Sequence, residues 1–285
     1  SYDLVLVHGP FHHRIAETRI DPRRVAVMGY PRYDDWFNGK FDKTSAKRKF
    51  LSDRHGKPVL LYLPTWADRS SIDRFADAVF KLSESFVIVV KPHHCTQRIE
   101  KERMKKLESG PVTMLDAYVD PQYAYALADI VLGDITSGAY VEPLLLGIKH
   151  IGLGSHNEYE SILHPCALDA IPTCTDPLKL ADLVHRVHAE PVSESAERLR
   201  NDLFGTSEGY DASLAAAAII NNVIGMPQAD PFYHEKYQFE QLKLRLAHYR
   251  RHTTNLTKLM LKNAFPESYG KLKNLRNRYW NKTGK

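Results

Sequence analysis

Short apolar runs alternate with amphipathic or charged segments over residues 58–153. Apolar runs of this length are typical of strands in a parallel sheet that is buried on both faces. The pattern predicts strands at 58–63, 86–90, 112–115, 130–132 and 148–153, with helices at 72–82, 96–107, 121–128 and 140–146 between them. Because strands and helices alternate regularly, we expect an α/β fold with a doubly wound parallel sheet.

The stretch 128–154 organises this region, and it is expected to form strand, loop, helix and strand in turn. Its polar loop, 133–138, would join the carboxyl end of a strand to a helix N-terminus. Such loops bind ligands in α/β sheets, and the backbone N–H groups there favour phosphate. The alternative is that Asp134, Thr136 and Ser137 only cap the helix, which explains these residue types equally well.

The rest of the chain predicts further elements on both sides of this region. We expect strands at 2–8 and 25–28, and helices at 10–18, 177–187, 193–201 and 212–224, with a charged connector at 38–56 that contains one helix. Because an α/β domain rarely begins on a strand, we expect the chain to be incomplete at its N-terminus. The predicted domains are the end of an N-terminal domain (1–40), a larger α/β domain (41–228) and a basic helical tail (229–285).

Composition narrows the class of protein. The chain has 285 residues, 43% of them hydrophobic, which is enough for a sizeable core. No apolar run approaches the ~18 residues of a membrane-spanning helix, and the first residues do not resemble a signal peptide. Cys95, Cys166 and Cys174 are odd in number, so we interpret them as reduced thiols of a cytoplasmic protein, although a Cys166–Cys174 disulfide is sterically conceivable.

The net charge of +5 is concentrated in the tail. Residues 230–285 contain 13 Lys and Arg against 4 Asp and Glu, a balance of +9, so the remainder has a balance of −4. A basic helix with interleaved aromatic residues suits the surface of an anionic membrane, and a solvated helix packed on the body or on a second subunit is the alternative. Nucleic acid is not an expected partner, because the body is acidic and carries no recognised binding motif.

Polar residues follow four of the predicted strands. Since the carboxyl ends of parallel strands meet at one edge of a sheet, these residues should converge on one cleft. The converging positions are Thr65 and Trp66, Lys91 and His93, Asp116, and the loop from Asp134 to Gly138. A cation, an imidazole and several hydroxyls together would bind a nucleotide diphosphate, with Glu142 accepting from ribose hydroxyls, and could support phosphoryl transfer.

Some of these residues also allow a structural or a metal-binding interpretation. Trp66 could be a core residue instead of a stacking platform. The His93–His94 pair suggests a metal, but no carboxylate or cysteine joins it at a ligand spacing, so no metal site is predicted. The chain lacks G-x-S-x-G, P-loop and G-x-G-x-x-G patterns, which argues against serine hydrolases, P-loop NTPases and dinucleotide oxidoreductases.

Short motifs occur in a fixed order along the chain. They are Gly29-Tyr30-Pro31-Arg32-Tyr33-Asp34, Leu61-Tyr62-Leu63-Pro64-Thr65-Trp66, Lys91-Pro92-His93, Ala128-Asp129 and Asp134-Ile135-Thr136-Ser137, with a closing Gly209, Asp211 and Ala212. This ordered set resembles the CDP-glycerol glycerophosphotransferases, the teichoic-acid and capsule polymerases with a GT-B fold. The resemblance covers roughly residues 2–224 and implies that 41–228 is the nucleotide-donor-binding domain and that 1–40 is the end of an acceptor-side domain. It implies that an acceptor hydroxyl attacks the β-phosphate of a CDP-linked donor and that CMP leaves.

The resemblance also implies a set of site residues and partners. The candidate site has His93 and Lys91 as catalytic residues and, for donor binding, Arg32, Thr65, Trp66, Asp116, Asp134, Thr136, Ser137, Gly138 and Glu142. No tightly bound cofactor is expected; the donor is a substrate, and the acceptor is a polymer or a lipid-linked chain. The expected location is the cytoplasm, with the tail on the inner face of the cell membrane.

The sequence departs from the family pattern at two motifs. Ala67 stands where the family usually has arginine, with Arg69 two positions on, and Ile135-Thr136 replaces Tyr-Ser. The family's His-Gly base motif lies much further before Gly-Tyr-Pro-Arg than His8-Gly9 does, so we do not transfer that role. A UDP-sugar glycosyltransferase or 2-epimerase of the same fold, and a non-catalytic nucleotide-binding module, therefore stay open as alternatives.

Overall fold

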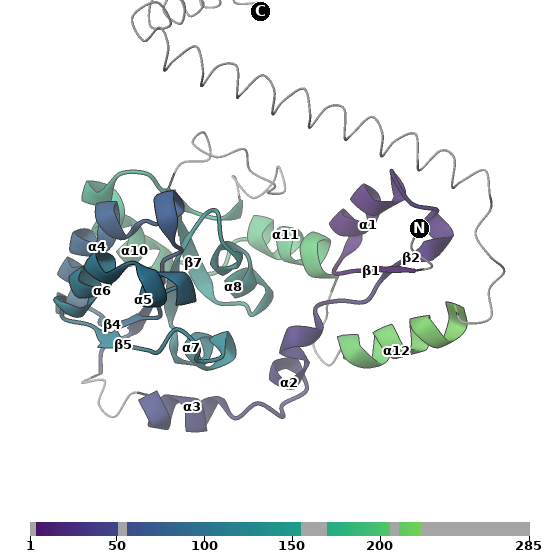
Figure 1. The fold of residues 1–285 in the computed structure, drawn as a ribbon, viewed down its shortest axis with the longest axis horizontal. Coiled ribbons are helices and arrows are strands. Elements are labelled where there is room, and N and C mark those ends of the chain that lie inside the picture. The colour runs from purple at the N-terminus through teal and green to yellow at the C-terminus, as the bar shows by residue number, and fades with distance from the viewer. Residues whose placement is uncertain (1–3, 51–55, 155–169, 206–210, 224–285) are drawn as a thin grey trace, which may run out of the picture.

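A six-stranded parallel sheet forms the centre of the computed structural model, which describes residues 4–50, 56–154, 170–205 and 211–223 (Figure 1). Its strands lie in the order β5-β4-β3-β6-β7-β8. Their bounds are β3 (Val59–Leu63), β4 (Val87–Val90), β5 (Thr113–Met114), β6 (Ile130–Asp134), β7 (Lys149–Leu153) and β8 (Thr173–Cys174). The chain runs outward from β3 to β5 on one side and returns through β6 on the other, so the order of connection reverses between β3 and β6.

Helices cover both faces of this sheet because the central strands are apolar on both sides. Leu60 and Tyr62 of β3 pack with one layer of helices, whereas Val59, Leu61 and Leu63 pack with the other. The first layer holds α4 (Ile72–Lys81), α6 (Lys101–Glu108) and α10 (Leu180–Ala189); the second holds α7 (Pro121–Leu127), α8 (Glu142–Leu145) and α11 (Glu194–Phe204). The predicted two-sided burial of the strands is therefore confirmed.

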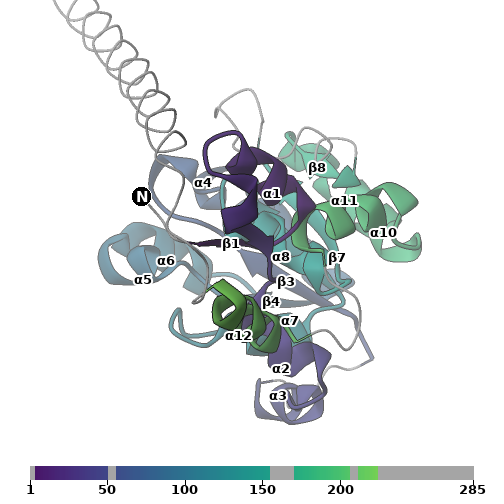
Figure 2. The ribbon, with the colours of Figure 1, turned by 90° about the vertical axis from the view of Figure 1, so that its right-hand side faces the viewer.

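A smaller group of elements lies beside the sheet (Figure 1). It contains the parallel strands β1 (Val5–Val7) and β2 (Val25–Val27) with the helices α1 (Pro10–Glu17), α2 (Asp34–Phe37) and α12 (Ala212–Val223). Helix α3 (Lys43–Phe50) instead packs against α7 of the sheet domain. Figure 2 shows α1 close to α11, where Arg14 forms a 2.6 Å ion pair with Asp202. The Asp34 carboxylate accepts the backbone N–H groups of Ala212 (2.9 Å) and Ser213 (2.8 Å), which connects α12 to α2.

The predicted helix 96–107 is wrong as a single element. The structure has α5 (His94–Ile99) and then α6, with Glu100 between them at φ −106° and ψ 66°. The Glu100 carboxylate accepts the Thr96 hydroxyl (2.8 Å) and the backbone N–H of Ala67 (2.8 Å). Contacts to a distant loop thus stabilise a break that the helical spacing conceals.

The helix predicted at 140–146 is also much shorter than expected. Strand β6 continues to Asp134, the segment Gly138–Tyr140 is a 3-10 helix, and α8 is a single turn. Gly133 allows the chain to fold back, since a Cβ there would lie 2.6 Å from the Ala139 carbonyl oxygen. Other short 3-10 helices are Pro22–Arg24, Pro31–Tyr33, Ala67–Arg69, Leu82–Glu84 and Pro177–Lys179.

Several predictions lie outside the described residues. The basic tail, the loop-rich segment with Cys166 and the Gly209 motif all fall there. Within the part of the chain that the structure describes, no helix has both the length and the apolar character needed to cross a bilayer.

Candidate functional site

A pocket of about 400 Å³ lies where strands β3, β4 and β6 end. This is the point at which the order of connection reverses, and ligands of open α/β sheets bind at such a point. Eight of the predicted site residues line it: Thr65, Trp66, Lys91, His93, Thr136, Ser137, Gly138 and Glu142. Of the four strand ends predicted to converge, those of β3, β4 and β6 line the pocket, and the end of β5, with Asp116, does not.

Lys91 and His93 follow β4. Lys91 brings a positive charge to the pocket, and His93 brings a hydrogen-bond donor. The Lys91 ammonium donates to the Ala117 carbonyl oxygen at 2.7 Å, and burial and the nearby Arg32 lower its pKa. The Nδ1 atom of His93 accepts the backbone N–H of Cys95 at 3.1 Å, so the proton of the neutral ring lies on Nε2. Burial, together with His94 and Lys91, lowers the His93 pKa, which favours this neutral form.

Trp66 stacks on the His93 ring at the edge of the pocket. The ring centroids are 5.8 Å apart and the planes differ by 12°. Because 40% of the Trp66 surface is exposed, the alternative that it is a core residue is wrong. The exposed ring face is available to a planar group.

The loop after β6 contributes both capping and free polar groups. The Ser137 hydroxyl oxygen accepts the backbone N–H of Ala139 at 3.1 Å, so it caps the 3-10 helix Gly138–Tyr140. The Thr136 hydroxyl oxygen is buried and has no hydrogen-bond partner within the described residues. Buried polar atoms normally have hydrogen-bond partners, so this hydroxyl in the pocket wall is free to form a hydrogen bond with a ligand.

Glu142 is the centre of a hydrogen-bond cluster. Its carboxylate accepts the hydroxyls of Tyr30 (3.1 Å), Tyr33 (2.9 Å) and Tyr125 (3.0 Å), and Arg32 lies 3.7 Å from Oε1. A carboxylate has about four acceptor positions, so about one stays open to a ligand hydroxyl. The sequence analysis did not assign the three tyrosines, although two of them flank Arg32 in the Gly-Tyr-Pro-Arg-Tyr-Asp motif.

Asp134 lies beneath the pocket and does not line it. Its Oδ2 atom accepts the backbone N–H groups of Thr65 (2.7 Å) and Ser71 (3.1 Å), and only 1% of the residue is exposed. Burial raises the pKa of this carboxyl to about 6, against the smaller opposing effect of its hydrogen bonds. The structure therefore gives Asp134 a role in holding the loop after β3.

Two other predicted residues are also absent from the pocket wall. Arg32 contacts Glu142 and is 45% exposed at its side chain. Asp116 is exposed and accepts from the side chain of Gln97 at 3.0 Å and the backbone N–H of Tyr118 at 2.8 Å. Their predicted contacts with the donor stay predictions.

The loop after β3 brings an unassigned cation to the pocket. Arg69 lines the pocket, although the family arginine position is occupied by Ala67. Ala67 has φ +59°, a left-handed conformation that costs a residue with a Cβ about 1–2 kcal/mol. Glu100 accepts its N–H at 2.8 Å, and Arg103 donates to its carbonyl oxygen at 2.6 Å, so two side chains keep this turn in place.

The sheet order and the helices on both its faces are those of a GT-B-type fold, as predicted. Two solved structures of the wall teichoic acid polymerase TagF, soaked with CDPG, superpose with TM-scores of 0.58 and 0.55 at 18% and 19% identity. Each superposition covers 78% of this chain, and the chain spans 56% and 58% of the TagF chains. At this identity the similarity shows the fold.

The sequence comparison identifies the family that this chain resembles. Residues 1–140 match the family model described as CDP-Glycerol:Poly(glycerophosphate) glycerophosphotransferase, which confirms the predicted resemblance. A UDP-GlcNAc 2-epimerase from Neisseria meningitidis, bound to UDP-GlcNAc, is more distant, with a TM-score of 0.49, 16% identity and coverage of 73% of this chain and 57% of its own. The comparison with curated proteins gives no match.

Proposed function

We propose that this chain binds the CDP-linked donor of a polyol-phosphate transferase that acts in cell-surface polymer synthesis, of the teichoic-acid or capsule type. The observation that carries the proposal is the pocket at the switch point, where Lys91, His93, Thr136 and Glu142 meet in one cavity. Its volume of about 400 Å³ lies within the range of small-molecule sites. The matched family model supports the choice of donor class.

The pocket residues suit a nucleotide diphosphate group by group. The Lys91 ammonium and the Arg69 guanidinium would neutralise the diphosphate, and the Nε2–H of His93 and the unpaired Thr136 hydroxyl would donate hydrogen bonds to it. The open acceptor position of Glu142 would take a ribose hydroxyl, and the exposed Trp66 face would take a planar base. Asp134 would act indirectly, by fixing the loop that carries Thr65.

In the proposed reaction an acceptor hydroxyl attacks the β-phosphorus of the donor. A new P–O bond forms, the bond to the CMP oxygen breaks, and the acceptor hydroxyl loses its proton to a base that we do not assign. Lys91 and His93 would stabilise the negative charge that moves onto the leaving CMP, because electrostatic stabilisation is the main contribution to such transfers. The acceptor, a polymer or lipid-linked chain, and contact of the tail with the inner membrane face belong to the same proposal.

The proposal is tested by thermal shift and calorimetry with CDP, CMP, UDP, GDP and ADP on the full chain. We expect CDP to stabilise the protein selectively, by ~2.7 kcal/mol at a hundredfold excess over Kd. His93→Ala should weaken this effect, whereas the matched control His13→Ala, on α1, should not. A selective effect of UDP would favour a sugar-nucleotide enzyme, and the absence of an effect with every nucleotide would refute the proposal.

A further inference from the structure

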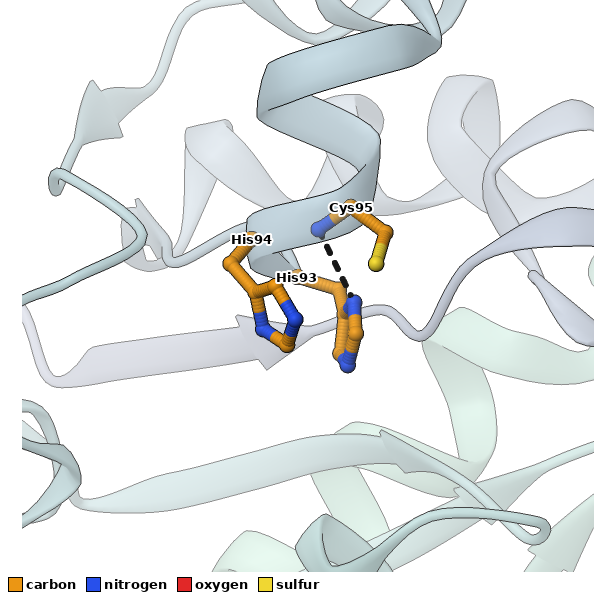
Figure 3. Close-up of side chains that lie close together, drawn as sticks. All are labelled: His93, His94 and Cys95. Carbon is orange, nitrogen blue, oxygen red and sulfur yellow. Dashed lines mark hydrogen bonds between the residues drawn. The ribbon is translucent and has the colours of Figure 1, made fainter.

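Three potential metal ligands stand together at the start of α5. Figure 3 shows the rings of His93 and His94 and the thiol of Cys95 on one side of the first helical turn. One ligand atom from each residue lies within 4.8 Å of the other two. No metal site is predicted from the sequence, because no carboxylate or cysteine pattern joins the two histidines at a familiar ligand spacing. In the structure, the helical turn brings the Cys95 thiol beside the two imidazoles.

We propose that His93, His94 and Cys95 form a binding site for a thiolate-preferring divalent metal ion, with Zn²⁺ as the expected occupant. Imidazole nitrogen and thiolate sulfur are both ligands that bind zinc in proteins, and three protein ligands leave a fourth position open. Zinc bonds of 2.0–2.3 Å place ligands about 3.5 Å apart, so the present atoms need to approach by roughly 1 Å.

The side chains differ in how easily they can make this movement. Cys95 is buried, with 8% of its surface exposed, whereas His94 is exposed. The His93 and His94 rings are already in contact, with centroids 4.1 Å apart. The exposed His94 side chain is therefore the one with the most room to move toward a bound metal ion.

The hydrogen bonding of His93 selects the atom that would bind the metal. Its Nδ1 atom accepts the backbone N–H of Cys95 at 3.1 Å, so this nitrogen carries a free electron pair that already faces Cys95. A zinc ion on Nδ1 replaces this hydrogen bond and leaves the proton on Nε2. The zinc–sulfur bond forms as the Cys95 thiol loses its proton to solvent, so metal uptake releases one proton.

Cobalt is a direct probe, because a thiolate bound to Co²⁺ gives a charge-transfer band in the near ultraviolet. We expect the full chain, without any nucleotide, to show this band at one equivalent of Co²⁺ and to lose it when Zn²⁺ is added. Cys95→Ser should abolish the band, and the double variant Cys166→Ser with Cys174→Ser, which keeps Cys95, should retain it. A band that persists in Cys95→Ser, or no band in the unsubstituted chain, would overturn the proposal.

A second variant keeps the test decisive if Cys95→Ser does not fold. His94→Ala changes an exposed side chain and should preserve the fold, as checked by circular dichroism. It should weaken Co²⁺ binding roughly tenfold or more, a loss of the size that follows from removing a metal-site interaction. Unchanged affinity in His94→Ala would refute the proposed ligand set, and because no donor is present this result is independent of the nucleotide experiment.

Discussion

The carboxylates of Asp134, at the end of β6, and of Glu142, at the start of α8, serve the pocket in different ways. Asp134 is enclosed, and its partners are the backbone N–H groups of Thr65 and Ser71. Glu142 has a side chain that is 13% exposed, and its partners are tyrosine hydroxyls and an arginine. One carboxylate holds a loop from below, and the other forms part of the pocket wall.

The difference between these carboxylates shows what each can contribute to function. Backbone amides are present whatever the side chain, so Asp134 can hold its loop without specific residues at positions 65 and 71. The Glu142 cluster instead depends on Tyr30, Tyr33 and Tyr125, which come from the small group of elements and from α7. It therefore links the Gly-Tyr-Pro-Arg motif to the sheet.

The largest expected effect is the loss of the enclosed carboxylate. Asp134→Ala removes two hydrogen bonds to a charged acceptor and leaves two buried N–H groups unpaired, so the free energy of unfolding should fall by about 3 kcal/mol or more. Urea denaturation measures this loss. Asp134→Asn keeps an acceptor oxygen and is the control; equal loss in both variants would contradict the role in holding the loop.

A smaller effect is expected at the open cluster. Tyr33→Phe removes one hydroxyl that donates to Glu142, which should lower the free energy of unfolding by about 1.5–3 kcal/mol. Tyr118→Phe, at a residue that is 70% exposed, is the matched control and should have little effect. In a double-mutant cycle, Tyr33→Phe and Glu142→Gln should be strongly non-additive; simple additivity would show that the cluster is not coupled.

The pH dependence of stability should separate the two carboxylates further. Burial raises the Asp134 pKa from 3.8 to about 6, so between these values the folded state binds more protons than the unfolded state. The extra stability of the protonated over the ionised Asp134 carboxyl is complete below about pH 4 and is lost as the pH rises through about 6, whereas its hydrogen bonds to Thr65 and Ser71 persist in both forms. Comparing urea midpoints of the wild type and Asp134→Asn across this range should show the difference, and parallel profiles would disprove the shift.

The smallest effect is expected at the strained turn beside the pocket. Ala67→Gly relieves the left-handed conformation at φ +59°, although glycine also gains freedom in the unfolded chain. The net result should be a stabilisation of about 0.5 kcal/mol, visible as a slightly higher Tm. Ala78→Gly, within helix α4, is the control and should destabilise; a similar loss at position 67 would argue against strain there.

The sequence by itself determined the sheet and its connections. Apolar runs such as 58–63 and 86–90 predict strands because their pattern reflects burial on both faces, and the alternation with helices implies parallel strands. Parallel strands end at one edge, so the meeting of Thr65, His93 and Thr136 followed without knowledge of any contact. The ordered motifs then predicted the family resemblance that the family model confirms.

The contacts of each polar residue at this edge of the sheet depend on the tertiary structure. Asp134 contacts Thr65, 69 positions earlier, and Glu142 contacts Tyr30, 112 positions earlier. Helical spacing and local motifs do not predict contacts between residues so far apart in the sequence. For the same reason they do not predict the break between α5 and α6 at Glu100. Whether a carboxylate or thiol faces a pocket, a loop or a neighbouring imidazole depends on segments that meet only after the chain has folded.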